Sequence, residues 1–151
     1  MKSLCVLFIM LLCLVGTTGA QRASKRRLVG NVKSNLVDGC GCYFKFRGTN
    51  RNSEQYMFSQ SVDQKAWMNI DGKDVQLKLL KERSPGDRER VGSKWTRSFS
   101  AGDISVSSTW VTSRMCAPND ENCESTDYDG TFFVRKGKRL ETVRAFGWCG
   151  C

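Results

Sequence analysis

Six of the eight cysteines in this 151-residue chain have a spacing that suggests either disulfide or metal chemistry. One Cys-Gly-Cys triplet, residues 40–42, is matched by a second at 149–151. Residues two apart in a strand point to the same side of a sheet, so antiparallel pairing of the triplets would bring their cysteines together in two parallel pairs. We therefore predict three disulfides, in the pairs Cys40–Cys151, Cys42–Cys149 and Cys116–Cys123.

The alternative is a metal site built from the four thiolates of the two triplets, because soft sulfur ligands in that number can hold zinc or copper(I). Structural zinc sites usually separate paired ligands by two to four residues, whereas a single glycine separates these. An oxidising compartment also favours disulfides. We therefore expect no metal, and thiolate metal binding remains an alternative function.

An acidic segment follows Cys116 and consists of Asp120, Glu121, Glu124, Asp127 and Asp129. It does not match a calcium-binding loop, because Ser125 stands where the first carboxylate should be and no glutamate closes the pattern. The segment is therefore predicted to be a solvated loop.

Catalytic chemistry is not indicated by the composition. The chain contains no histidine, which removes the commonest general base and the usual activator of a serine or cysteine nucleophile. It also has no G-x-S-x-G motif and no glycine-rich phosphate loop. We expect a protein that is not an enzyme and that carries no cofactor.

The first 20 residues are typical of a signal peptide. Lys2 precedes an apolar stretch over 4–15, and small residues follow up to Ala20, after which we predict cleavage. Cys5 and Cys13 would leave with the signal. The mature protein is thus expected to be exported, either periplasmic or secreted, with an even number of cysteines.

The mature protein is predicted to be basic. Without Lys2, 23 Lys and Arg face 15 Asp and Glu, a net charge of +8. The positive charge is concentrated in two clusters: Arg22, Lys25, Arg26 and Arg27; and Arg135, Lys136, Lys138, Arg139 and Arg144. Such clusters favour association with anionic surfaces or polymers, although solvated faces that keep the protein soluble have the same composition.

Residues 21–38 are polar and poorly periodic, and we predict a flexible basic arm there, followed by a single β domain over 39–151. The pair Asp71-Gly72 suits a tight hairpin turn, and residues 81–90 are predicted to be a long exposed loop. The alternating pattern predicts eight short strands, over 42–47, 55–59, 66–70, 75–80, 94–99, 104–112, 131–135 and 140–146. The fold class is therefore all-β, a small antiparallel barrel or sandwich joined by disulfides.

Four tryptophans accompany the phenylalanines of this domain: Trp67, Trp95, Trp110 and Trp148. Aromatic side chains could form a stacking platform for sugars or bases. On the strands of a small barrel they more often fill the core, and we predict the core position for them.

The run from Trp67 to Leu79, WMNIDGKDVQLKL, together with the Cys-Gly-Cys triplets, resembles a family of small exported bacterial proteins of no established function. This resemblance covers nearly the whole mature domain. It implies export and a disulfide-linked fold.

A weaker resemblance is to the exported inhibitors of C-type lysozyme, which are small eight-stranded barrels. Their D-G-K hairpin, S-G-x-[RK]-Y motif and K-G-D turn correspond in order to 71–73, 91–95 and 101–103. Lys94 matches the basic residue of the motif and Trp95 the aromatic one, whereas Val91 stands in place of the serine. The resemblance implies that Lys94 and Trp95 contact a partner.

These observations predict an exported, non-catalytic binding protein whose partner is an anionic component of the envelope or another protein. The alternatives are an inhibitor of a cell-wall hydrolase that acts through Lys94, and a thiolate metal-binding protein. We expect no specific nucleic-acid partner and no transmembrane segment.

Overall fold

The structure, a computed structural model, describes residues 26–33, 39–117, 119–120 and 123–151. The predicted signal peptide lies outside these residues. Within them the chain forms one short 3₁₀ helix, η1 (Gly86–Arg88), and nine strands. The strands are β1 (Val29–Gly30), β2 (Gly41–Phe46), β3 (Phe58–Ser61), β4 (Ala66–Ile70), β5 (Lys73–Arg83), β6 (Lys94–Ala101), β7 (Ile104–Arg114), β8 (Ser125–Lys136) and β9 (Arg139–Gly150).

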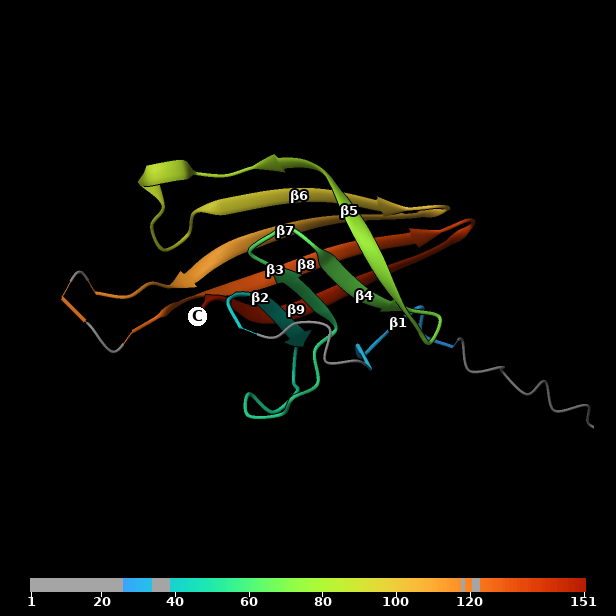
Figure 1. The fold of residues 1–151 in the computed structure, drawn as a ribbon, viewed down its shortest axis with the longest axis horizontal. Coiled ribbons are helices and arrows are strands. Elements are labelled where there is room, and N and C mark those ends of the chain that lie inside the picture. Colours follow the sequence, from blue (N-terminus) through green and yellow to red (C-terminus); the bar gives the residue numbers. More distant parts are fainter. Residues whose placement is uncertain (1–25, 34–38, 118, 121–122) are drawn as a thin grey trace, which may run out of the picture.

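The strands form a closed antiparallel barrel, as predicted. Their order in the sheet is β1-β4-β3-β2-β9-β8-β7-β6-β5, and an additional pairing of β4 with β5 closes eight of them into a barrel (Figure 1). β1 is the extra strand and pairs only with β4. Closure leaves most strands without a free edge.

Alternate residues of each strand fill the interior of the barrel. Phe44, Phe58, Trp110 and Phe132 are buried there, and the ring centroids of Phe44 and Trp110 are 4.5 Å apart. The core position predicted for the tryptophans is thus confirmed for Trp110. The other three tryptophans are only partly buried. Trp95 packs against the core, whereas Trp67 and Trp148 lie on the outer face, because Met68 and Cys149 beside them point inward.

The barrel has two ends of different character. The turns between β4 and β5, β6 and β7, and β8 and β9 all lie at one end, which we call the turn end and which is at the right of Figure 1. The first of these turns is the predicted hairpin, in which Asp71 and Gly72 both have positive φ angles, of 53° and 81°. The opposite end, which we call the disulfide end, carries both Cys-Gly-Cys triplets.

All three predicted disulfides are present: Cys40–Cys151, Cys42–Cys149 and Cys116–Cys123. Cys42 and Cys149 are direct partners in the register of β2 with β9. A side chain at Gly41 or Gly150 would clash with backbone atoms of the neighbouring segments, so glycine permits this close approach. The four thiols that the metal alternative requires are therefore joined in disulfides instead.

Part of the predicted flexible arm belongs to the barrel. Of residues 21–38 the structure describes 26–33, in which Leu28 and Val29 are buried and β1 pairs with β4. The polar composition around Leu28 conceals this, because a two-residue strand is too short to show alternation.

Other boundaries also differ from the prediction. The strand predicted over 55–59 is β3, which begins only at Phe58, and β8 and β9 extend beyond the ranges predicted over 131–135 and 140–146. The exposed loop predicted over 81–90 begins later, because β5 continues to Arg83 beyond an irregularity in its pairing with β6 between Leu79 and Lys81. The acidic segment is not wholly a loop, because Asp127 and Asp129 lie in β8. In the described part of the chain, no helix has the length and apolar character needed to span a membrane.

Candidate anion-binding site

The turn end gathers basic residues that are far apart in the sequence. The segment before β1 contributes Arg26 and Arg27, and the β8–β9 hairpin contributes Lys136 at the end of β8, Lys138 in the turn and Arg139 at the start of β9. The guanidinium of Arg139 donates a hydrogen bond of 2.9 Å to the backbone carbonyl of Arg26. The described members of the two predicted basic clusters therefore meet at this end, except for Arg135 and Arg144, which lie along the exposed outer face of β8 and β9.

Buried contacts hold the basic segment in place. Leu28 and Val29 pack into the turn end, and their backbone N–H groups donate hydrogen bonds of 2.6 Å and 3.1 Å to the carboxylate of Glu141. The carbonyl of Leu28 accepts a hydrogen bond of 2.8 Å from the backbone N–H of Asp71. Arg26 and Arg27 are thus fixed on the barrel by the two apolar residues that follow them.

Asp71 connects two of the cations. Its carboxylate accepts hydrogen bonds from Lys136, at 3.0 Å, and from Arg139. The hydrogen bond from Lys136 is the main cause that lowers the pKa of Asp71, and that from Arg139 adds to it. The carboxylate thus stays ionised and positions both cations.

A groove of about 770 Å³ runs along the turn end between residues 26–33 and the end of β2. Its charged lining consists of Arg26, Arg27, Lys33 and Arg47, and we call this groove the basic groove. The remaining lining is neutral: Val29, Gly30, Asn31, Phe46, Gly48, Thr49, Asn69 and Gly72. Among the residues that the structure describes, no carboxylate side chain lines this groove.

The four cations of the basic groove are open to a partner, because all four residues are exposed. The ammonium of Lys33 donates a 3.0 Å hydrogen bond to the carbonyl of Gly72, and the guanidinium of Arg27 lies 5.7 Å from the centre of the Phe46 ring. Arg47 pairs with Asp129 at 2.6 Å, but both side chains are more than half exposed and such pairs contribute little. The groove can therefore attract an anion without first breaking a strong internal ion pair.

The disulfide end holds Lys94 and Trp95, the residues that the lysozyme-inhibitor resemblance singled out. They are neighbours at the start of β6, so their side chains point to opposite faces. Lys94 is exposed, whereas Trp95 is partly buried and its Nε1 donates a hydrogen bond of 2.9 Å to Glu89. The strand therefore does not present the two side chains on one surface.

Glu89 itself closes part of the disulfide end. Besides Trp95, its Oε1 accepts hydrogen bonds from Thr112, at 2.6 Å, and from the hydroxyl of Tyr128, at 3.0 Å. Burial and the nearby Glu89 both raise the pKa of Tyr128. The loop after β5 is thus anchored to β6, β7 and β8 by one carboxylate.

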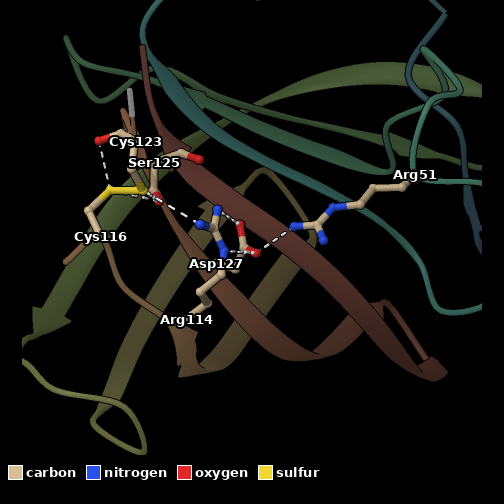
Figure 2. The surroundings of a disulfide bond; sticks show 6 residues. All are labelled: Arg51, Arg114, Cys116, Cys123, Ser125 and Asp127. Atoms are coloured by element: carbon tan, nitrogen blue, oxygen red, sulfur yellow. Dashed lines mark hydrogen bonds and ion pairs between the residues drawn. A yellow bond between two sulfur atoms is a disulfide. The ribbon is translucent and has the colours of Figure 1, made fainter. Parts of the chain in front are cut away.

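The third disulfide stands beside an ion-pair network on the outer face of β8 (Figure 2). Asp127 accepts hydrogen bonds from Arg114, at 2.8 Å, and from Arg51, at 2.5 Å. Burial raises the pKa of Asp127, but the hydrogen bonds from the two arginines outweigh it and leave the pKa below its ordinary value. Arg114 also lies 3.5 Å from the sulfur of Cys123. These contacts neutralise a carboxylate that the sequence assigned to a solvated loop.

Sequence reasoning identifies two of the four cations of the basic groove. It identified Arg26 and Arg27, whereas Arg22 and Lys25 of the same cluster lie outside the described residues. It missed Lys33 and Arg47, which carry no distinguishing local pattern. Only closure of the barrel brings Arg47, at the end of β2, beside the segment before β1.

Comparison of the chain with protein-family models, with curated proteins and with solved structures finds no match.

Proposed function

We propose that this protein is an exported, non-catalytic binding protein that holds an anionic polymer of the cell envelope or surface in the basic groove. The observation that carries the proposal is the clustering of Arg26, Arg27, Lys33 and Arg47 around one groove whose described lining includes no carboxylate side chain. Like charges that line one groove repel one another, and an anionic partner relieves that repulsion.

A polymer fits this site better than a small anion does. The groove is open, and its cations are exposed rather than focused on one buried point. Each exposed cation contributes only about 0.2–1 kcal/mol to an ion pair, so useful affinity requires several contacts at once. A chain of repeating anionic groups supplies them.

Export is supported by the disulfides, since three such bonds persist in oxidising compartments and are rare in reducing ones. The absence of histidine from the sequence supports a non-catalytic role.

The proposal is tested with a triple variant that carries Arg26→Gln, Arg27→Gln and Arg47→Gln. Its matched control loses the same charge elsewhere, through Lys78→Gln, Lys81→Gln and Arg88→Gln, all at exposed positions outside the groove. The probes are phosphatidylglycerol vesicles and soluble polygalacturonate, which separate a lipid surface from a polysaccharide. Binding is measured by co-sedimentation and by titration.

The groove variant should bind at least one probe about tenfold more weakly than wild type, the sum of three exposed contacts of about 0.5 kcal/mol each. The control should retain most of the affinity. Equal losses in both variants would show that only net charge matters and would overturn the proposal. A wild-type protein that bound neither probe would also overturn the proposal.

A further inference from the structure

A second recess lies at the disulfide end, on the opposite side of the molecule from the basic groove. It exists because β4 pairs with β5 only as far as Ala66 and Leu77, whereas β5 continues to Arg83 with β6 as its partner. The second half of β5 thus leaves an opening beside β3. The recess has a volume of about 320 Å³ and is lined by Cys40, Gly41, Cys42, Gln60, Ser61, Val62, Gln64, Glu82, Arg97, Cys149, Gly150 and Cys151.

The floor of this recess carries a buried cation. Arg97 lies on the inner face of β6, and only 11% of its side chain is exposed. Its guanidinium lies 4.1 Å from the centre of the Trp110 ring and 5.1 Å from that of Trp95. Burial lowers the pKa of Arg97, but a guanidinium stays protonated in proteins. The barrel therefore holds a permanent positive charge against its aromatic core.

The hydrogen-bonding capacity of Arg97 is only partly used. One Nη donates a 2.8 Å hydrogen bond to the side-chain carbonyl of Gln60. The Nε lies 2.5 Å from a carboxylate oxygen of Glu82, yet its N–H has no hydrogen bond of good geometry. Arg97 also lines the recess. Part of the planar set of N–H donors of the Arg97 guanidinium thus faces the recess.

Glu82 is a replaceable partner for this cation. Its side chain is 35% exposed and lies near the end of β5, between the exposed residues Lys81 and Arg83. It can move into solvent without disturbing the core. A buried arginine is costly unless it is well paired, so a better-aligned carboxylate would stabilise Arg97 more than Glu82 does.

We propose that this recess binds a small carboxylate with an apolar body, whose carboxylate pairs with Arg97 in place of Glu82. The volume of about 320 Å³ lies at the lower end of the range of about 300–1,000 Å³ for small-molecule sites, which suits a ligand of about ten non-hydrogen atoms. The apolar body would lie against Val62 and the two end disulfides. The planar fork of arginine matches a carboxylate, and the recess is too small for a polymer.

The test uses octanoate as the probe, with octanol as its neutral counterpart and octyl phosphate as its phosphate counterpart. Binding is followed by titration calorimetry and by the fluorescence of Trp95 and Trp110, which flank the guanidinium. Octanoate should bind and octanol should not. Octyl phosphate should bind more weakly than octanoate. Octanol binding as tightly as octanoate, or tighter binding of the phosphate, would overturn the assignment.

Two variants test the residues. Glu82→Gln removes the competing carboxylate at a partly exposed position, so octanoate should bind about tenfold more tightly. Arg97→Met keeps the volume but removes the charge, and octanoate binding should be lost. Arg83→Gln, exposed on the same strand, serves as the control and should match wild type.

The proposal is overturned if Glu82→Gln leaves octanoate binding unchanged or weakens it. This outcome can be measured even if Arg97→Met fails to fold. The triple variant of the basic groove should bind octanoate as wild type does, so the result is independent of the proposed polymer binding.

Discussion

The backbone N–H of Leu28 donates a hydrogen bond of 2.6 Å to the carboxylate of Glu141, which joins the segment before β1 to the start of β9. The two residues are 113 positions apart in the chain. This contact fixes the segment that carries Arg26 and Arg27 to the turn end, so the basic groove depends on it.

Replacing Glu141 by alanine should lower the free energy of unfolding by about 1–3 kcal/mol, because the N–H groups of Leu28 and Val29 lose their acceptor in a buried position. Urea unfolding measures the change. The exposed Glu124→Ala serves as the control and should stay within about 0.5 kcal/mol of wild type. An equally small effect of Glu141→Ala would show that the segment is not held by this carboxylate.

Leu28→Ala should lower the free energy of unfolding by about 2–5 kcal/mol, since Leu28 is only 2% exposed and its loss leaves a cavity at the turn end. Leu140→Ala provides a matched control, because Leu140 is 57% exposed and its truncation should cost little. Thermal and urea unfolding of both variants give the comparison. Similar small losses would mean that residues 26–30 behave as an arm rather than as part of the barrel.

Replacing Cys42 and Cys149 together by serine should lower stability without changing the fold, because Cys40–Cys151 still closes the same long loop. The second, nested bridge restricts the unfolded chain less than the first, so the loss should be about 1–2 kcal/mol. Unfolding without reductant measures it, and circular dichroism checks the fold. A peptide map of the wild-type protein that joined Cys40 to Cys123 would contradict the pairing.

Asp127 should make stability depend on pH. Its pKa is lower in the folded protein than the ordinary value near 3.9, so its contribution is complete above about pH 4 and is lost as the pH falls through the folded pKa. Asp127→Asn should therefore be less stable than wild type at pH 7, and the difference should shrink below about pH 4. Urea unfolding across this range measures the difference. The exposed Asp103→Asn is the control, and a difference for Asp127→Asn that stayed constant with pH would refute the assignment.

The alternating strands and the cysteine pairs could be predicted because their signals are local. Phe44 and Phe46 alternate with polar neighbours, and Asp71-Gly72 marks its hairpin directly. The identical spacing of the two triplets also specifies a register. In such segments the side-chain period and the turn chemistry alone determine the structure.

Other features depend on contacts that no local pattern reveals. Val29 joins the sheet through a two-residue strand, and Asp127 enters β8 because two distant arginines neutralise it. Arg97 occupies an inward position that the alternation of β6 assigns to apolar residues. The basic groove also has no local signal in the sequence, because Arg27 and Arg47 meet only after the barrel has closed.

The most direct test of polymer binding at the basic groove is the salt dependence of the dissociation constant, measured for wild type and for the triple variant of Arg26, Arg27 and Arg47. Each cation in contact with a polyanion releases about one counterion, so removal of three cations should reduce the slope of log Kd against log salt concentration by about two to three. The control variant at Lys78, Lys81 and Arg88 should keep the wild-type slope. The same slope for wild type and the groove variant would contradict binding at this groove.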